Sequence, residues 1–146
     1  MRASWAETRE GHPDPALRPR VYEGSFGQVF ALCVRAAEEL DTVELAEADP
    51  RRAVVAGWVK LAPFAALPLL GPPKHPGSVG LGWFRRLDPR LAKGWLQVRL
   101  DPLEKGGVRV TGHVRLELPL AGRLAAALLK NYLRWLDLRW GMPVKP

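Results

Sequence analysis

Residues 94–118 read GWLQVRLDPLEKGGVRVTGHVRLEL, and residues 119–140 continue as PLAGRLAAALLKNYLRWLDLRW. Within residues 108–118, valine or leucine alternates with polar side chains. An alternation with a period of two is typical of a β-strand with one dry face. After Pro119 the apolar residues recur with the 3.6-residue period of a helix. The stretch therefore predicts a pair of strands, turned at paired glycines, and a long helix over about residues 120–140.

This last helix carries an unusually wide apolar surface. One stripe holds the polar residues Arg123, Lys130, Arg134 and Asp137. The remaining arc, roughly 200° wide by helical geometry, is apolar, whereas an ordinary surface helix needs only about 100°. We therefore expect the helix to pack on a sheet with one side and on something else with the other.

The first half of the chain predicts a helix and further strands. Ser25 followed by Gln28 is a capping box, which starts a helix over about residues 26–40. Further strands are expected over residues 20–24, 42–48, 53–61 and 78–87. Consecutive hairpins favour a single antiparallel sheet. The expected fold class is α+β: an antiparallel sheet of about six strands, with one N-terminal helix and a long C-terminal helix packed on one face in a helix-grip-like layout.

The expected organisation is an N-terminal tail over residues 1–19 and a single α+β domain over residues 20–146. The tail has no apolar period and contains several prolines. Residues 62–77 combine five prolines with apolar side chains. Proline at this density excludes an interior strand or a long helix, so the segment is either a rigid cover over the core, a lid over a cavity, or a contact with a membrane or partner.

Composition favours a soluble, cytoplasmic protein. No apolar run reaches about 18 residues, and the N-terminus lacks a signal-peptide pattern. Few heat-labile side chains are present, as in proteins of thermophiles. Residues 1–50 carry 5 Arg against 10 acidic residues, and residues 51–146 carry 17 basic against 5 acidic residues. The split indicates either a basic surface for an anionic partner or two halves that attract each other.

Chemistry-bearing motifs are scarce. His12, His75 and His113 have no second ligand at metal-binding spacing. Cys33 lies within an apolar helical pattern, where a small core residue is expected. His113 lies among arginines on the polar side of its strand, and a solvated face explains it better than acid–base catalysis. The sequence indicates no catalytic residue, no metal site and no cofactor, and it disfavours an enzyme.

Residues 94–140, about a third of the chain, resemble the START-like and polyketide-cyclase-like families. The resemblance rests on the long strand pair, the PLAGRL entry at residues 119–124 and the leucine-rich helix. The first half differs, because one continuous helix stands where these families usually place two short ones. The resemblance implies a helix-grip fold with an apolar cavity between sheet and helix, which in some members binds lipids or other hydrophobic small molecules.

Three functions follow as hypotheses. The first is a binding module for a hydrophobic small molecule, with a cavity lined by Trp58, Phe64, Trp83, Leu124, Leu128, Tyr132 and Trp135. The second is an interaction protein that forms a homodimer through its surplus apolar surface. The third is nucleic-acid binding through basic residues interleaved with tryptophans, namely Arg86, Arg90, Lys93, Arg99, Arg109 and Arg115 with Trp83 and Trp95.

Overall fold

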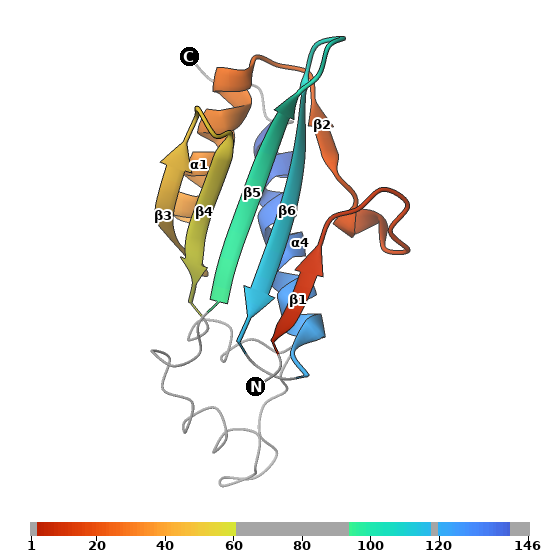
Figure 1. The fold of residues 1–146 in the computed structure, drawn as a ribbon, viewed down its shortest axis with the longest axis vertical. Helices are drawn as coiled ribbons and strands as arrows, with labels where there is room; N and C mark the ends of the chain where they lie inside the picture. Colours follow the sequence, from red (N-terminus) through yellow and green to blue (C-terminus); the bar gives the residue numbers. More distant parts are fainter. Residues whose placement is uncertain (1–2, 61–93, 118–119, 141–146) are drawn as a thin grey trace, which may run out of the picture.

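The computed structural model describes residues 3–60, 94–117 and 120–140 of the chain. The elements follow in the order β1 (Ser4–Glu7), η1 (Pro15–Leu17), β2 (Arg20–Tyr22), α1 (Phe26–Glu39), β3 (Val43–Asp49), β4 (Val54–Val59), β5 (Gly94–Pro102), β6 (Val108–Leu116) and α4 (Gly122–Trp140) (Figure 1). The expected strand over residues 78–87 and the proline-rich segment 62–77 lie outside the described residues.

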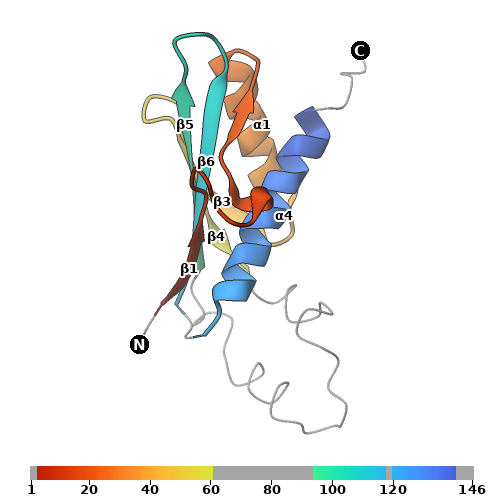
Figure 2. The same cartoon turned by 90° about the vertical axis from the view of Figure 1, so that its right-hand side faces the viewer.

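The strands form one six-stranded antiparallel sheet in the order β1-β6-β5-β4-β3. Strand β2 also pairs with β6, so that β1 and β2 follow each other along the same side of that strand. Both helices lie on one face of the sheet (Figure 2). Figure 1 looks onto the other face, which neither of the two described helices covers. The prediction of an α+β fold with both helices on a single face is confirmed.

The β5–β6 hairpin is the centre of the sheet. Its register places Leu96 opposite Val114 and Leu100 opposite Val110, and all four side chains are buried. At the turn, Gly106 and Gly107 have φ angles of 92° and 90°. A side chain rarely adopts such angles, and this is why the turn needs its two glycines. The period-two pattern of the sequence therefore corresponds to one buried face and one outward face.

Helix α1 begins where the capping box places it. Ser25 Oγ accepts from the Gln28 amide at 3.2 Å, and Gln28 Oε1 accepts from the Ser25 amide at 3.1 Å. Its buried residues include Val29 and Cys33, which face the sheet and α4. The prediction of a core position for Cys33 is confirmed.

The N-terminal segment is part of the sheet, and the expectation of a tail over residues 1–19 is corrected here. Strand β1 pairs with residues 113–116 of β6, and Thr8 exchanges hydrogen bonds with the backbone of Gly112. Ser4, Ala6 and Thr8 are buried while the residues between them are exposed. Since these buried side chains are short and mostly polar, the alternation carries no hydrophobic signal in the sequence.

Helix α4 lies in a cradle formed by β1 and β6, by α1 and by η1. Its buried residues are Leu124, Ala125, Leu128, Leu129, Tyr132, Leu133 and Leu136. A Cβ atom added at Gly112 of β6 would lie 2.7 Å from Leu129 Cδ1, so this glycine lets the helix approach the sheet closely. The Trp140 ring packs 5.3 Å from the Tyr22 ring of β2. The sheet, α1 and the N-terminal segment each pack on a different side of α4, and together they account for its wide apolar arc.

A matched pair of glycine substitutions tests how tightly β3 and β4 are joined. A Cβ added at Gly57 would lie 2.6 Å from the backbone oxygen of Glu44, whereas nothing lies within 4 Å of one added at Gly27 in α1. We expect Gly57→Ala to lower the free energy of unfolding by about 1–3 kcal/mol. Gly27→Ala should raise it by about 0.5–1 kcal/mol. Urea denaturation measures both, and equal effects of the two substitutions would contradict the close approach.

Candidate functional site

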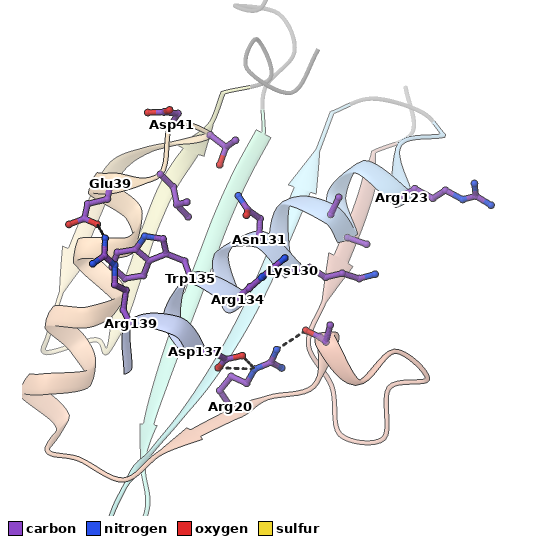
Figure 3. A pocket seen from close by; sticks show the side chains of 15 residues that line it. Arg20, Glu39, Asp41, Arg123, Lys130, Asn131, Arg134, Trp135, Asp137 and Arg139 are labelled. Carbon is purple, nitrogen blue, oxygen red and sulfur yellow. Dashed lines mark hydrogen bonds and ion pairs between the residues drawn. The ribbon is translucent and has the colours of Figure 1, made fainter. Parts of the chain in front are cut away.

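A broad open hollow lies over the outward side of α4, away from the sheet (Figure 3). Its volume is about 1330 Å³. One wall is the end of α1 with the turn into β3, and the opposite wall is η1 with the start of β2. The side chains along it come from α4 between Arg123 and Arg139. The hollow therefore depends on the way α4 is set between α1 and the N-terminal segment.

The floor of the hollow is apolar and consists mostly of small side chains. Ala126 and Ala127 are half-buried and present only methyl groups, and Leu40 closes the floor on the side of α1. Trp135 is also half-buried, with the guanidinium carbon of Arg139 5.2 Å from the centre of its ring. A cation at this distance is attracted by the indole ring. The floor thus offers an indole edge and methyl groups to the apolar part of a ligand.

The rim of the hollow is mainly basic. Arg20 pairs with Asp137 at 3.1 Å, Arg139 pairs with Glu39 at 3.3 Å, and Lys130 pairs with Asp14. Within the described residues, neither Arg123 nor Arg134 forms an ion pair, and both are exposed. Spacings of seven and four residues place Arg123, Lys130 and Arg134 on one stripe of the helix. Two cations on this stripe are therefore left to meet an anionic group.

Two acidic side chains near the hollow, Asp14 and Asp137, connect the N-terminal segment to α4. The hydrogen bond with Lys130, followed by the one from the Ala16 amide, lowers the pKa of Asp14 below its usual value. Tyr22 donates a hydrogen bond of 2.7 Å to Asp137 Oδ1. Burial, reinforced by that hydrogen bond, raises the pKa of Tyr22. Both acids are held by groups of the chain itself, and they tie η1 and β2 to α4.

The structure divides the residues expected to line a cavity between sheet and helix. Leu124, Leu128 and Tyr132 lie in the core between α4 and the sheet. Tyr132 is fully buried and donates a hydrogen bond of 2.7 Å to the backbone oxygen of Cys33. Burial raises the pKa of this phenol. At this position the space between the two helices and the sheet is filled by the Tyr132 ring.

The other expected residues lie elsewhere. Trp135 borders the hollow on the far side of α4. Trp58 lies on the open face of the sheet with 48% of its surface exposed, edge to face with Trp95 at 4.7 Å between ring centres. Phe64 and Trp83 lie outside the described residues. The structure therefore brings Leu124, Leu128 and Tyr132 together and separates them from Trp58 by the thickness of the sheet.

The residues expected to contact nucleic acid are also divided. Arg99, Arg115 and Trp95 share the open face of the sheet, because Trp95 pairs with Arg115 and Arg99 lies four residues along β5 from Trp95. Arg109 pairs with Glu10 at 2.6 Å. The remaining candidates, Trp83, Arg86, Arg90 and Lys93, lie outside the described residues.

The sequence did not predict the basic rim of the hollow. It also did not show that Arg20, Lys130 and Arg139 form ion pairs while Arg123 and Arg134 form none within the described residues. The sequence places Arg123 and Arg134 on the polar stripe of the last helix, which is an ordinary position for charged residues on a helix. Their seven- and four-residue spacing from Lys130 was visible in the sequence. What was not visible is that the end of α1, with Leu40, lies beside this helix and turns its outward side into a hollow.

The two histidines among the described residues have partners within the chain. His12 Nδ1 accepts a hydrogen bond of 3.0 Å from the Asp14 amide, and the His113 ring stacks on Trp5 with 6.1 Å between ring centres. Among residues 3–60, 94–117 and 120–140, no three His, Cys, Asp or Glu side chains gather as metal ligands. No helix in this part of the chain has the length and apolar character needed to span a membrane.

Comparison with known proteins adds no family to this description. No protein-family model matches the sequence, and a search of curated proteins finds no match either. The function has to be argued from the geometry of the hollow and of the open sheet face.

The chemistry of Cys33 gives a direct test of the core. Burial raises the pKa of its thiol to about 12, and the thiolate is the reactive form. We expect native protein at pH 8 to react with a thiol-specific disulfide reagent at least about 100-fold more slowly than protein in guanidinium, where the pKa returns to about 8.5. The matched control carries Cys33→Ala with Ala31→Cys, which moves the thiol to an exposed position of the same helix. Equal native rates for the two proteins would contradict the buried position.

Proposed function

We propose that this protein is a binding module for an amphipathic molecule with an anionic group, held in the hollow over α4. The apolar part of the ligand packs on Trp135, Leu40 and the two alanines of the floor. Its anionic group meets the guanidinium of Arg134, with Arg123 further along the same stripe. The observation that carries the proposal is the combination of an apolar floor with rim cations that have no acidic partner among the described residues.

The physical reason for this ligand class is that the hollow offers two kinds of contact, an apolar surface and cationic side chains. Apolar contact contributes about 25 cal/mol for each Å² of surface removed from water, but it does not select among apolar molecules. A charge-assisted hydrogen bond contributes about 1.5–3 kcal/mol and requires an anion. Arg134 presents a planar fork of donors that suits a carboxylate or a phosphate. A molecule with both parts gains from both surfaces at once.

The START-like resemblance of residues 94–140 supports the same class of ligand, since some members of those families bind lipids or other hydrophobic small molecules. The position differs from the one that the resemblance implies. Tyr132 and Leu128 fill the space between helix and sheet at their level, and the hollow opens on the other side of α4. The proposal therefore keeps the hydrophobic ligand and moves it to the outward side of the helix.

A homodimer is the second proposal. The apolar arc of α4 is taken up by the sheet, α1 and the N-terminal segment, so this helix gives little reason to dimerise. Trp5 and Trp58, with 57% and 48% of their surfaces exposed, favour the open face of the sheet instead. Large exposed aromatic side chains on one face of a sheet are typical of interaction surfaces.

Nucleic-acid binding is the third proposal, and we place it behind the other two. Arg99 and Arg115 with Trp95 offer charge and a stacking surface on the open face. Glu44 and Glu47 lie on that same face, in register with Trp58 and Ala56. Carboxylates repel the phosphate backbone, so the mixed charge of the face disfavours this class of partner.

Dodecyl phosphate and dodecyltrimethylammonium, used below their micelle concentrations, test the ligand class. We expect dodecyl phosphate to change the tryptophan fluorescence and the cationic surfactant to bind at least about 10-fold more weakly, because only the anion gains the contact with Arg134. Arg134→Gln should weaken the binding of dodecyl phosphate about 10-fold. Trp135→Ala should abolish the fluorescence change.

Arg35→Gln is the matched control, since Arg35 is exposed on α1 and does not line the hollow. It should leave the affinity for dodecyl phosphate unchanged. Equal binding of both surfactants, or equal losses in Arg134→Gln and Arg35→Gln, would rule out recognition of an anion in the hollow.

A further inference from the structure

The face of the sheet opposite the helices carries an ordered row of side chains. Register pairs join Glu44 to Trp58, Trp58 to Trp95, Trp95 to Arg115 and Arg115 to Trp5. Paired residues of neighbouring strands point to the same face. Because Trp58 is half exposed on the open face, the whole row lies there. It crosses the sheet from β3 to β1 in the order acid, indole, indole, base, indole.

The two charges of the row lack partners within the described residues. Neither Glu44 nor Arg115 takes part in an ion pair there, and both are exposed. They lie on β3 and β6, three strand spacings apart, which is about 14 Å. This distance is too long for an ion pair within one chain. The two charges therefore flank the Trp58–Trp95 pair as separate acidic and basic ends.

The order of the row makes the face complementary to itself. Consider a second copy facing the first, turned about a two-fold axis that runs along the strands between β4 and β5. The turn reverses the row, so that Arg115 meets Glu44 of the second copy and Trp95 meets its Trp58. The symmetry then supplies each contact twice, as in every two-fold interface.

The neighbouring row has an acidic residue at each end. Register pairs join Glu47 to Ala56, Ala56 to Gln97, Gln97 to His113 and His113 to Glu7 of β1, and Glu47 forms an ion pair with Arg52 of its own chain at 2.9 Å. Under the same two-fold turn, His113 meets Glu47 of the second copy. The row of Glu44 and Arg115, in which an acid of β3 faces a base of β6 of the second copy, therefore carries the charge complementarity that favours a second copy over other partners.

We infer that the open face of the sheet is the interface of a homodimer with this two-fold arrangement. Two sheets that pack face to face lie about 10 Å apart, a gap that the four indoles of Trp58 and Trp95 in the two copies are large enough to fill. The dimer places both hollows on its outer surfaces, because each hollow lies on the helical side of its own sheet. It does not depend on the ligand proposed above.

The size of the face sets the expected strength. Under the two-fold turn four strands, β3 to β6, lie opposite a strand of the second copy; at about 4.8 Å apart and with about three outward residues each, they span about 400 Å². A standard interface buries about 800 Å² on each partner. We therefore expect a dimer that dissociates on dilution through the micromolar range, and whose affinity falls as salt screens its ion pairs.

Charge reversal with rescue tests the arrangement. Sedimentation velocity of the full chain between about 1 and 200 μM gives the dissociation constant at low salt. We expect Glu44→Arg and Arg115→Glu each to weaken the dimer at least about 10-fold, because each places like charges opposite one another at two symmetric positions. The double variant restores the pairs between the copies and should return to within about threefold of the original constant. Glu38→Arg on the exposed side of α1 is the matched control and should change nothing.

Trp58→Ala tests the apolar part and should also weaken the dimer at least 10-fold, with an unchanged circular dichroism spectrum showing that the sheet is intact. The proposal is overturned if the chain stays monomeric at 200 μM or if the double variant is as weak as the single ones. It is equally overturned if a labelled oligothymidylate binds the monomer and Trp58→Ala abolishes that binding, since the face then belongs to nucleic acid.

Discussion

The burial of α4 is the constraint on which the rest of the structure depends. Seven of its residues are buried, and at roughly 1.5–3 kcal/mol for each large apolar side chain their transfer from water is on the order of 10 kcal/mol. That is as large as the whole net stability of a typical domain, about 5–15 kcal/mol. No single flat surface reaches all sides of such a helix. The positions of α1, η1 and β1 follow from the need to bury α4 on several sides. The hollow lies over the outward side of the helix, between α1 and η1, where no described element packs on it.

The sequence predicts the parts of this arrangement that repeat a strong local pattern. The β5–β6 hairpin, the capping box of α1 and the long last helix were all expected near their observed bounds, because each has many residues that obey one period. Strand β1 was missed for a physical reason. Ser4 and Thr8 are held by hydrogen bonds and by pairing with residues more than 100 positions away, and neither leaves a hydrophobic pattern in the sequence.

The candidate site was predictable only in part. Trp135 was expected to contact a ligand, and it borders the hollow. Arg134 lines the hollow only because α1 lies beside α4, and no local sequence pattern encodes that position. Trp58 is a different case. Trp58 stands between Gly57 and Val59 in its strand, so the sequence predicts that its side chain points to the face opposite to theirs. Periodicity defines two faces of a strand, but it does not say which face the helices cover.

The two proposed surfaces lie on opposite sides of the packed layer of sheet and helix α4, and the contacts within this layer decide whether they communicate. A ligand over α4 changes the open face only if it shifts the helix against the sheet. The helix is held near its start by the hydrogen bond from the Ala121 amide to Ser4 Oγ, and near its end by Tyr22 on Asp137. Between these points Leu129 fits over Gly112 without spare room. A shift of α4 against the sheet would break contacts at all three places. Ligand binding and dimer formation are therefore expected to be independent.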